Sequence, residues 1–390
     1  MRTDLQRYYV YTVLSSLTFT WTTWFVFVAS RGGNPGWAES AFHLAILLGE
    51  VPTGVVADML GRRRSMLIGL VLSAASLFGY AWISDTLTAC LLLGLTGLSL
   101  TFISGADTAL LYETAEAAGG EELARRAIAR ASALQMATLA VAPVIAGWLS
   151  ERHPLAPFFA HGAMTLLAAA VVWTMQEPAA AAPGPAAGPR RRSPWAHTLA
   201  ALTYLRRRPD LLALVAFAWV YEAVASMVSQ FGQVYLPALG LSLFGAGMVF
   251  SAGRLLGAAG GWIAERLTGE AADRWLRWGP LGQAVLIMLA GLARTARGAA
   301  ALALNEGLDG LVYPLLSARI NQAIPTAQRA TILSFQSLGS SLLIAAAFPA
   351  AAALPSVFLV YGIVGGGLAI AALARVLQRQ RAAVRPAGGR

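Results

Sequence analysis

Long, uninterrupted runs of apolar residues recur along almost the whole of this 390-residue sequence. A run of about 20 apolar residues crosses the hydrocarbon core of a bilayer as an α-helix, so repeated runs indicate repeated spans. Because the bilayer core offers no water, the backbone of each span must satisfy its own hydrogen bonds, and these runs are too long for barrel strands. The pattern therefore predicts an all-α, multi-pass membrane protein.

The runs fall into two sets of six, with boundaries good to a few residues. The first set covers residues 8–29, 38–58, 66–84, 87–109, 129–150 and 155–176. The second set covers residues 210–236, 242–265, 276–293, 298–318, 330–350 and 355–377. The residues between the sets are rich in Pro, Ala and Gly and then in Arg, a composition typical of a solvated linker. We expect an N-terminal six-helix bundle at 1–180, a cytoplasmic linker at 181–209 and a C-terminal six-helix bundle at 210–390.

The few charged residues exclude several classes of protein. Charged residues make up 12% of the chain, about half the share of a soluble domain. Every basic residue is an arginine, which excludes a phosphate-binding loop of the G-x-x-x-x-G-K type. Cys90 is the single cysteine, and the four histidines show no H-E-x-x-H spacing. We therefore expect no enzymatic activity, no metal and no cofactor.

The arginines also predict an orientation in the membrane. The net charge is +10, but the arginines lie between the apolar runs, which argues against nucleic-acid binding. Of the 29 arginines, 24 lie on the same side as the N-terminus, and only Arg31, Arg152, Arg294 and Arg297 lie in the opposite loops. Positive residues are retained on the cytoplasmic side, so both termini and the linker are expected there. The first run lacks a small-residue cleavage site, which favours a retained helix over a signal peptide. We expect a bacterial inner (plasma) membrane location.

The loop after the second run carries the most specific motif. It reads Gly54-Val-Val-Ala57-Asp58-Met-Leu-Gly61-Arg62-Arg63-Arg64. This spacing resembles the signature loop between the second and third helices of the major facilitator superfamily. Gly54 and Gly61 allow a close helix approach and a tight turn, and Asp58 can pair with a nearby arginine. The alternative is an ordinary basic loop that follows the charge bias.

Two further segments are similar to motifs of the same family. Gly261-Trp-Ile-Ala264-Glu265 repeats the first part of the signature loop 207 residues later, as expected for the internal repeats of this superfamily. Pro143 and Gly147 in the fifth run resemble its antiporter motif, although small residues at this spacing also occur in plain helix packing. The resemblance implies two pseudo-symmetric six-helix bundles and a drug or metabolite efflux-like branch.

Charged residues within the runs are the candidates for coupling and substrate binding, because a charge at the bilayer centre costs about 2.5–3.5 kcal/mol on insertion scales. Glu222 shares a helix face with Gln230 and Gln233, which predicts contact with water or substrate, or else hydrogen bonding between helices. Glu306 and Asp309 are expected near the midplane, where two close acids do not both ionise easily. The candidate set for the cavity is Glu222, Glu306, Asp309, Arg254, Glu50, Gln230, Gln233, Asn305 and Tyr313.

Alternatives remain for several of these residues. Arg254 either binds an anionic substrate or neutralises Glu306 and Asp309, and Glu50 either titrates or hydrogen-bonds within the first bundle. Asp107 and Glu113 lie near the inner ends of spans, where we expect gate contacts, with Glu113 pairing with arginines of the signature loop. The expected gate comprises Gly54, Asp58, Gly61, Arg62, Arg63, Asp107, Glu113, Gly261 and Glu265.

The residues and the resemblance together predict secondary transport of a small molecule by alternating access. Acids outnumber Arg254 among the buried candidates, which suits protons and cationic or amphipathic substrates and favours proton-coupled efflux by antiport. The alternatives are a proton- or sodium-coupled importer and a non-transporting membrane sensor. The expected partners are a small-molecule substrate, protons and the lipid bilayer; no nucleic acid is expected, and the protein is expected to be a monomer.

Overall fold

A computed structural model describes residues 2–177, 202–325 and 328–384, and all regular elements within these ranges are helices. The chain divides into two compact units. Unit 1 comprises Met1–Arg192 and Ser242–Ser251, and unit 2 comprises Ser193–Leu241 and Ala252–Arg390. Most of the linker expected at 181–209 lies outside the described residues.

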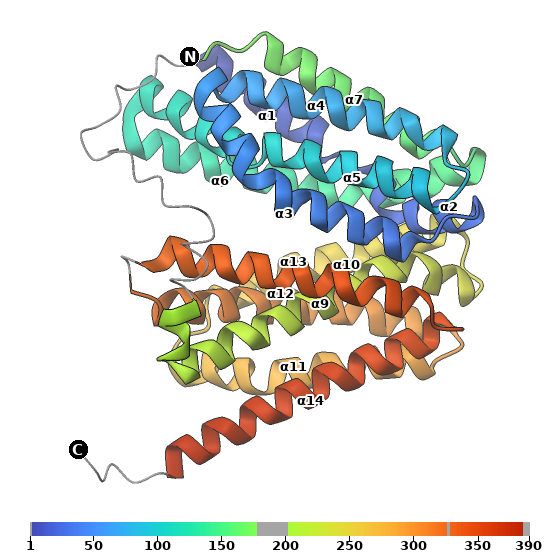
Figure 1. Cartoon of the computed structure of the whole chain (residues 1–390), viewed down its shortest axis with the longest axis vertical. Coiled ribbons are helices and arrows are strands. Elements are labelled where there is room, and N and C mark those ends of the chain that lie inside the picture. The colour runs from blue at the N-terminus through green and yellow to red at the C-terminus, as the bar shows by residue number, and fades with distance from the viewer. Residues whose placement is uncertain (1, 178–201, 326–327, 385–390) are drawn as a thin grey trace. The chain divides into compact units, whose positions relative to one another are not determined.

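Unit 1 contains the helices formed by the first six apolar runs (Figure 1). They are α1 (Arg2–Ser16), the 3₁₀ helix η1 (Phe19–Thr22), α2 (Trp24–Ser30), α3 (Pro35–Leu60), α4 (Arg62–Gly79), η2 (Tyr80–Trp82), α5 (Thr86–Ile103), α6 (Ala106–Arg152) and α7 (Ala156–Trp173). Helix α3 packs on α5, α4 packs on α5 and α7, and α1 packs on α6 and α7. All of these pairings except α4 with α5 bring together helices that are not neighbours in sequence.

Small and hydroxyl side chains make these helix contacts close. A Cβ added to Gly97 on α5 would collide with the backbone of Phe42 on α3. The Ser65 hydroxyl donates to the Phe102 carbonyl at 2.6 Å, and the Thr53 hydroxyl donates to the Thr101 carbonyl at 3.0 Å. Since lipid provides no hydrophobic force between helices, such small contacts and interhelical hydrogen bonds determine which helices pair.

The first expected span, 8–29, is a broken helix. The N–H of Thr18 bonds to the Ser16 carbonyl at 2.9 Å, and the N–H of Phe19 bonds to the Leu17 carbonyl at 3.1 Å, in place of the helical i→i−4 pattern. The two parts of the span are bent by 42°. The segment is rich in threonine, whose branched side chain and hydroxyl both weaken a helix. The prediction of one continuous helix was therefore wrong in detail.

A second difference concerns the segment between the fourth and fifth expected spans. Helix α5 ends at Ile103 rather than near residue 109, and Gly105 has a φ of 77°. Helix α6 then runs from Ala106 to Arg152, with non-helical backbone angles at Gly119 and Gly120. Gly105 and Gly120 both have a φ of 77°, which glycine adopts without the steric cost of a Cβ. The polar segment between these two spans is therefore mostly helical, with a glycine kink.

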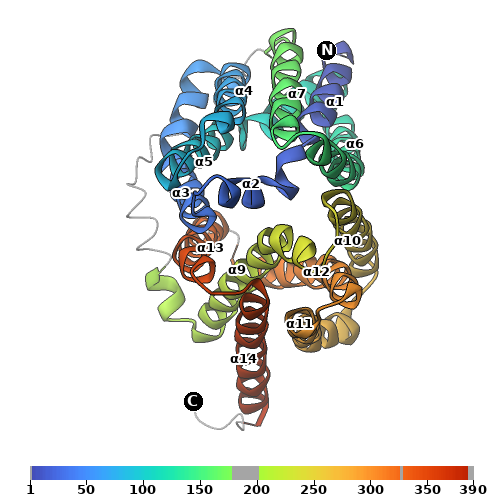
Figure 2. The same ribbon diagram turned by 90° about the vertical axis from the view of Figure 1, so that its right-hand side faces the viewer.

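Unit 2 is built from the helices of the second set of runs (Figure 2). They are α9 (Pro209–Ala238), α10 (Leu243–Ala264, of which the part from Ala252 belongs to unit 2), α11 (Gly269–Leu292), α12 (Ala296–Ala323), α13 (Arg329–Ala352) and α14 (Val357–Val384). Helix α9 packs on α12, α13 and α14, and α11 packs on α12 and α14. Helix α9 therefore packs against three other helices of unit 2.

About twelve membrane spans are expected from the sequence, and fewer of the described helices are both long and apolar enough to cross a bilayer. By length and composition, eight helical segments could cross a bilayer, or nine if α1, η1 and α2 form one bent span. The segment Thr86–Arg152 counts once in that number, although it contains both α5 and α6. Helices α11 and α12 are not included, and α12 carries two partly buried acids, Glu306 and Asp309. The expected all-α architecture is confirmed.

Candidate transport site in unit 2

A hydrogen-bonded cluster of polar side chains lies inside unit 2, between α9, α11 and α12. The hydroxyl oxygen of Tyr221 lies 2.7 Å from Oε1 of Gln283 and 2.8 Å from Oδ1 of Asp309. The Gln283 amide nitrogen lies 3.4 Å from the same Asp309 oxygen. Tyr221 and Gln283 are only 2% and 3% exposed. Three helices therefore hold one carboxyl group of the membrane region in a closed set of hydrogen bonds.

The number of hydrogens available in this cluster determines which hydrogen bonds can form at the same time. A phenol carries one hydrogen, so Tyr221 can donate to Gln283 or to Asp309, but not to both. If Asp309 is a neutral acid, it donates to Tyr221, and Tyr221 donates to Gln283. If Asp309 is ionised, it accepts a hydrogen bond from the Tyr221 hydroxyl, and the amide of Gln283 must reorient to remain paired. The cluster can thus exist with or without one proton by turning a hydroxyl and an amide.

Glu306 lies one helical turn from Asp309, at the crossing of α12 with α10. A Cβ added to Gly253 would come within 3.1 Å of the Glu306 Cγ atom. Arg254 is the next residue on α10 after Gly253. Arg254 is exposed and forms no ion pair with any residue in the described parts of the chain. The guanidinium is therefore near these acids but not engaged by them.

Glycines explain why α10 and α12 approach so closely. A Cβ on Gly260 would collide with the backbone of Gly307 and would lie 2.9 Å from the Leu311 nitrogen. A Cβ on Gly310 would collide with the backbone of Gly257. Since the colliding atoms are backbone atoms, they cannot turn aside as a flexible side chain can. Gly261, which the sequence pattern singled out, makes only ordinary contact, because its added Cβ would lie 3.6 Å from the Gly310 carbonyl oxygen.

The remaining candidates of unit 2 differ in their surroundings. Glu222 on α9 accepts a hydrogen bond of 3.0 Å from the Gln336 amide on α13, which is the expected alternative of bonding between helices. Gln230 and Gln233 are buried and bond to each other at 2.7 Å, so they face the interior of unit 2 and not open water. Asn305 is 4% exposed, and its Oδ1 atom has no hydrogen-bond partner among the described residues. Tyr313 is 44% exposed.

In unit 1, the signature loop forms a tight, charged turn between α3 and α4. Gly61 has a φ of 94°, which favours glycine. Asp58 accepts a hydrogen bond of 2.8 Å from Arg62, and the Arg63 guanidinium donates to the Met175 carbonyl at 2.7 Å. Glu177 accepts a bond of 3.4 Å from the Arg63 N–H. The loop is thus anchored at the end of α7, through residues that the motif alone does not identify.

The other gate candidates are less closely engaged. Glu113 forms no ion pair with the loop arginines within the described ranges, and Asp107 accepts a 2.6 Å bond from the N–H of Thr108 in the first turn of α6. Glu265 is exposed at the end of α10, and Glu50 is exposed on α3. The loop arginines expected as partners of Glu113 are therefore not paired with it among the described residues.

The two glycines of the signature loop predict opposite effects of substitution. Gly61→Ala requires a left-handed backbone and places a Cβ against the Glu177 carboxylate, so we expect a loss of about 1–3 kcal/mol in unfolding free energy. Gly54→Ala meets nothing within 4 Å and should be neutral or slightly stabilising, because alanine favours a helix. Thermal unfolding of the purified variants in detergent measures both. Equal melting temperatures would contradict the role of Gly61.

The antiporter-like segment of α6 packs against the beginning of α10 within unit 1. A Cβ on Gly147 would lie 2.8 Å from the Phe244 Cα atom, and a Cβ on Gly247 would collide with the backbone of Pro143. Glu151 accepts a hydrogen bond of 2.9 Å from the Phe244 N–H. The small residues at this position therefore make a close helix contact. Plain helix packing was the alternative to an antiporter motif for this segment.

Outside the spans, local hydrogen bonds lower the pKa of the Asp85 carboxyl group. Asp85 precedes α5, and its carboxylate accepts a 2.8 Å hydrogen bond from the Thr88 N–H. This bond and the Thr88 hydroxyl hold the pKa of Asp85 below its usual range.

No group of three or more His, Cys, Asp or Glu residues that could hold a metal occurs in the described residues.

Sequence reasoning did not identify Tyr221, Gln283 or Gln336. Each is polar or amphipathic and lies within an apolar run, but none is charged. Of the three, Gln283 could have been identified as a candidate from the sequence, because an amide within a span needs a hydrogen-bonding partner in the protein. Only the packing of α9, α11 and α12 shows that its partners are Tyr221 and Asp309.

Two compact units of long, mostly apolar helices, with polar side chains at the helix crossings, define a multi-pass membrane protein of the transporter class. The sequence matches the Major Facilitator Superfamily over residues 10–347, and the chain belongs to this family. The signature-loop resemblance is thereby confirmed at the level of the superfamily. No curated protein matches the sequence.

Solved structures with a similar fold include several transporters. The nucleoside transporter NupG has a TM-score of 0.76 and 15% identity, with 97% of this chain and 100% of that chain covered. The POT family transporter PepTSo has a TM-score of 0.71 and 12% identity, with 99% of each chain covered. A D-xylose–proton symporter has a TM-score of 0.70 and 13% identity, with 95% and 96% covered. At these identities the likeness shows the fold, not the substrate.

Proposed function

We propose that this protein is a proton-coupled secondary transporter that exports a small cationic or amphipathic compound by alternating access. Asp309 carries the coupled proton, and Glu306 lies beside it as the second acid. The observation that supports this most directly is Tyr221 between Gln283 and Asp309, at 2.7 and 2.8 Å. A carboxyl group in this setting can gain or lose a proton with only local rotation of its neighbours.

The charge of the region supports a cationic substrate. Glu306 and Asp309 lie within one turn of α12, and Arg254, the basic residue next to them, is exposed and forms no ion pair among the described residues. When both acids are ionised, the region attracts a cation, and when the proton returns, the attraction falls. Competition between substrate and proton for the same carboxylates is the simplest coupling for antiport.

Import by symport is a second candidate, because a D-xylose–proton symporter and a nucleoside transporter share the fold. In that case the proton and an uncharged polar substrate bind together. The unpartnered Oδ1 of buried Asn305, four residues before Asp309, is the acceptor that such a substrate would use. A non-transporting sensor would move neither compound nor proton.

Everted membrane vesicles with an acidic interior separate these possibilities. A panel of cationic, neutral and anionic compounds is added outside, or loaded inside, while a dye reports the pH gradient. For an exporter by antiport, an external cationic compound dissipates the gradient; for a symporter, an internal compound does so. Substrate movement without any proton movement would overturn proton coupling. Failure of every compound to move in either direction would favour the sensor.

Two variants test whether the dye response depends on the acids of α12. Glu306→Gln is expected to reduce the dye response strongly, because it removes one of the two neighbouring acids. Glu270→Gln is the matched control, since Glu270 is an exposed acid in the first turn of α11 in the same unit. An equal response from both variants would place the coupling acid elsewhere.

A further inference from the structure

A basic pocket lies at one end of unit 2, away from the Asp309 cluster. Its volume is about 480 Å³, and its walls come from the beginning of α9, the end of α12 and the last part of α14. The lining includes Arg208, Arg319 and Arg375, with Asp210 as the one acidic residue. A space of this size accommodates a small polar group.

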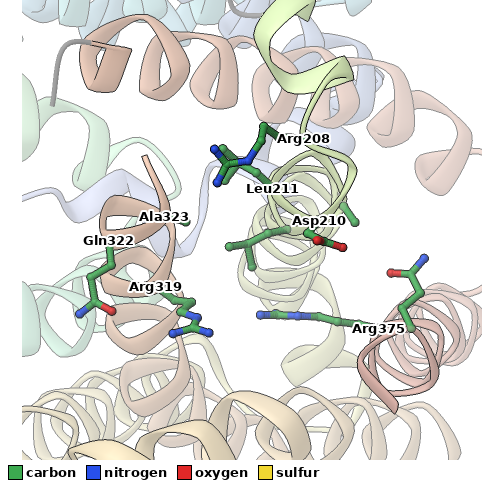
Figure 3. A pocket seen from close by; sticks show the side chains of 10 residues that line it. Arg208, Asp210, Leu211, Arg319, Gln322, Ala323 and Arg375 are labelled. Atoms are coloured by element: carbon green, nitrogen blue, oxygen red, sulfur yellow. The ribbon is translucent and has the colours of Figure 1, made fainter. Parts of the chain in front are cut away.

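The three guanidinium groups converge on this space. In Figure 3, the side chains of Arg208, Arg319 and Arg375 extend from three different segments and surround the same opening. Arg208 and Arg319 are exposed and form no ion pair with a residue that the structure describes. The three arginines are 111 residues (Arg208 to Arg319) and 56 residues (Arg319 to Arg375) apart in sequence, and the charge bias of membrane loops does not by itself bring such residues to one pocket.

Arg375 is held in place by an aromatic ring. Its guanidinium carbon lies 4.6 Å from the centre of the Phe217 ring, and its side chain is half-buried. A cation over a ring face is stabilised by the ring quadrupole, which restricts the side chain to this position. The pocket is therefore partly pre-organised before any ligand binds, and this lowers the entropic cost of binding.

Helix α9 begins at the same pocket. Arg208 is the residue before its first turn, and Pro209 and Asp210 follow. Pro209 has no N–H, but the N–H groups of Asp210 and Leu211 in the same first turn have no acceptor in the helix and carry a partial positive charge. Together with three guanidinium groups against one carboxylate, this gives the pocket a net positive field. A planar guanidinium pairs with phosphate oxygens in a bidentate manner, more favourably than with a monovalent halide.

We propose that this pocket binds a phosphate-bearing anion through Arg208, Arg319 and Arg375. The arginine bias of the sequence is expected to place this end of unit 2 at the cytoplasmic surface, where anionic phospholipid headgroups are concentrated. The headgroup of an acidic phospholipid and a soluble phosphate compound share this chemistry. The site does not depend on the identity of the transported compound or on the coupling ion.

The test uses the full-length protein in detergent with a neutral phosphatidylcholine background. Its thermal stability is titrated with phosphatidylglycerol, with inorganic phosphate, and with sodium chloride at matched ionic strength. We expect phosphatidylglycerol or phosphate to raise the melting temperature at concentrations where chloride does not. A response to phosphatidylglycerol alone identifies a lipid site, and a response to inorganic phosphate as well identifies a site open to soluble ligands.

The variants decide whether this pocket is responsible. In the Arg208→Gln/Arg319→Gln double variant, the apparent affinity should fall about a hundredfold, since one charged hydrogen bond accounts for about tenfold or more. Arg206→Gln/Arg207→Gln removes two neighbouring exposed arginines that do not line the pocket, and it should retain the wild-type response. Arg208 and Arg319 are exposed, so their substitution should not prevent folding, which the melting temperature in phosphatidylcholine alone verifies.

Two outcomes would overturn the assignment. One is the absence of any stabilisation by either phosphatidylglycerol or inorganic phosphate. The other is an equal loss of response in the pocket variant and in the Arg206/Arg207 control, which would show that general surface charge is responsible. If Arg375→Gln is folded, its affinity should also fall about tenfold; an unchanged affinity would exclude Arg375 from the site.

Discussion

Vesicles containing the Asp309→Asn variant are expected to show no more substrate-driven proton movement than vesicles without the protein. Asparagine has nearly the same shape as a protonated aspartic acid. Its amide can donate to the Tyr221 hydroxyl while Tyr221 donates to Gln283, so the hydrogen bonds of the cluster persist. The variant should therefore fold, bind substrate and exchange it across the membrane, but without coupling to protons.

The measurement compares two assays on the same vesicles. The dye assay reports coupled proton movement, and counterflow of labelled substrate reports exchange without net proton transfer. Glu222→Gln is the control within the same unit, because an amide at this position can still bond to Gln336. Wild-type proton movement in Asp309→Asn would refute the proposed coupling site, and loss of both assays would indicate a structural role instead.

Tyr221→Phe tests the partner of Asp309 separately. The change keeps the ring but removes the hydroxyl that joins Gln283 to Asp309. Leaving a buried polar group unpaired costs about 1–3 kcal/mol, so the unfolding free energy should fall by that amount. The pH at which coupling is half-maximal should also shift, because the ionised form of Asp309 loses a hydrogen-bond donor. An unchanged pH profile would show that Tyr221 has only a packing role.

The second large effect is expected from Gly260→Ala at the crossing of α10 and α12. The added Cβ would collide with the backbone of Gly307 and would lie 2.9 Å from the Leu311 nitrogen. Overpacking of this kind typically costs about 1–3 kcal/mol, because the helices must separate. The melting temperature should fall, and transport should fall with it, because Glu306 lies on the same stretch of α12.

Gly261→Ala is the matched control for this prediction. Gly261 is the next residue on the same helix, and its added Cβ would lie 3.6 Å from the Gly310 carbonyl oxygen, an ordinary contact. Both substitutions make the same gain in helix propensity. A difference in melting temperature between the two variants therefore measures the helix contact alone, and equal values would contradict the packing described for this crossing.

The sequence by itself determined the class of fold. Apolar runs of about 20 residues leave the helix as the only spanning structure that pairs its own backbone, so the number and approximate position of the spans follow from composition. The spacing of Gly54, Asp58 and Gly61 was specific enough to indicate the superfamily, because a tight turn and a paired carboxylate need those residue types. The acids of α12 also stood out, since charge within a span is costly.

Contacts between distant segments were decided only by the tertiary structure. The threonine-rich first span has the hydropathy of a continuous helix, but local hydroxyl and backbone competition breaks it near Phe19. Gln230 and Gln233 follow a polar stripe that suggested a cavity, yet the packing of unit 2 turns them toward each other. Gln283 and Tyr221 carry no charge and gave no strong pattern, although they complete the site of Asp309.

The arginine pocket is a second example of contacts that the sequence alone does not reveal. Arg208, Arg319 and Arg375 each satisfy the charge bias of cytoplasmic segments, and nothing in their spacing distinguishes them from other arginines of the chain. Their convergence depends on the beginning of α9, the end of α12 and the last part of α14 meeting at one end of unit 2. Hydropathy and residue type are local properties that a sequence displays directly. Proximity depends on how the helices pack, which is a property of the folded chain.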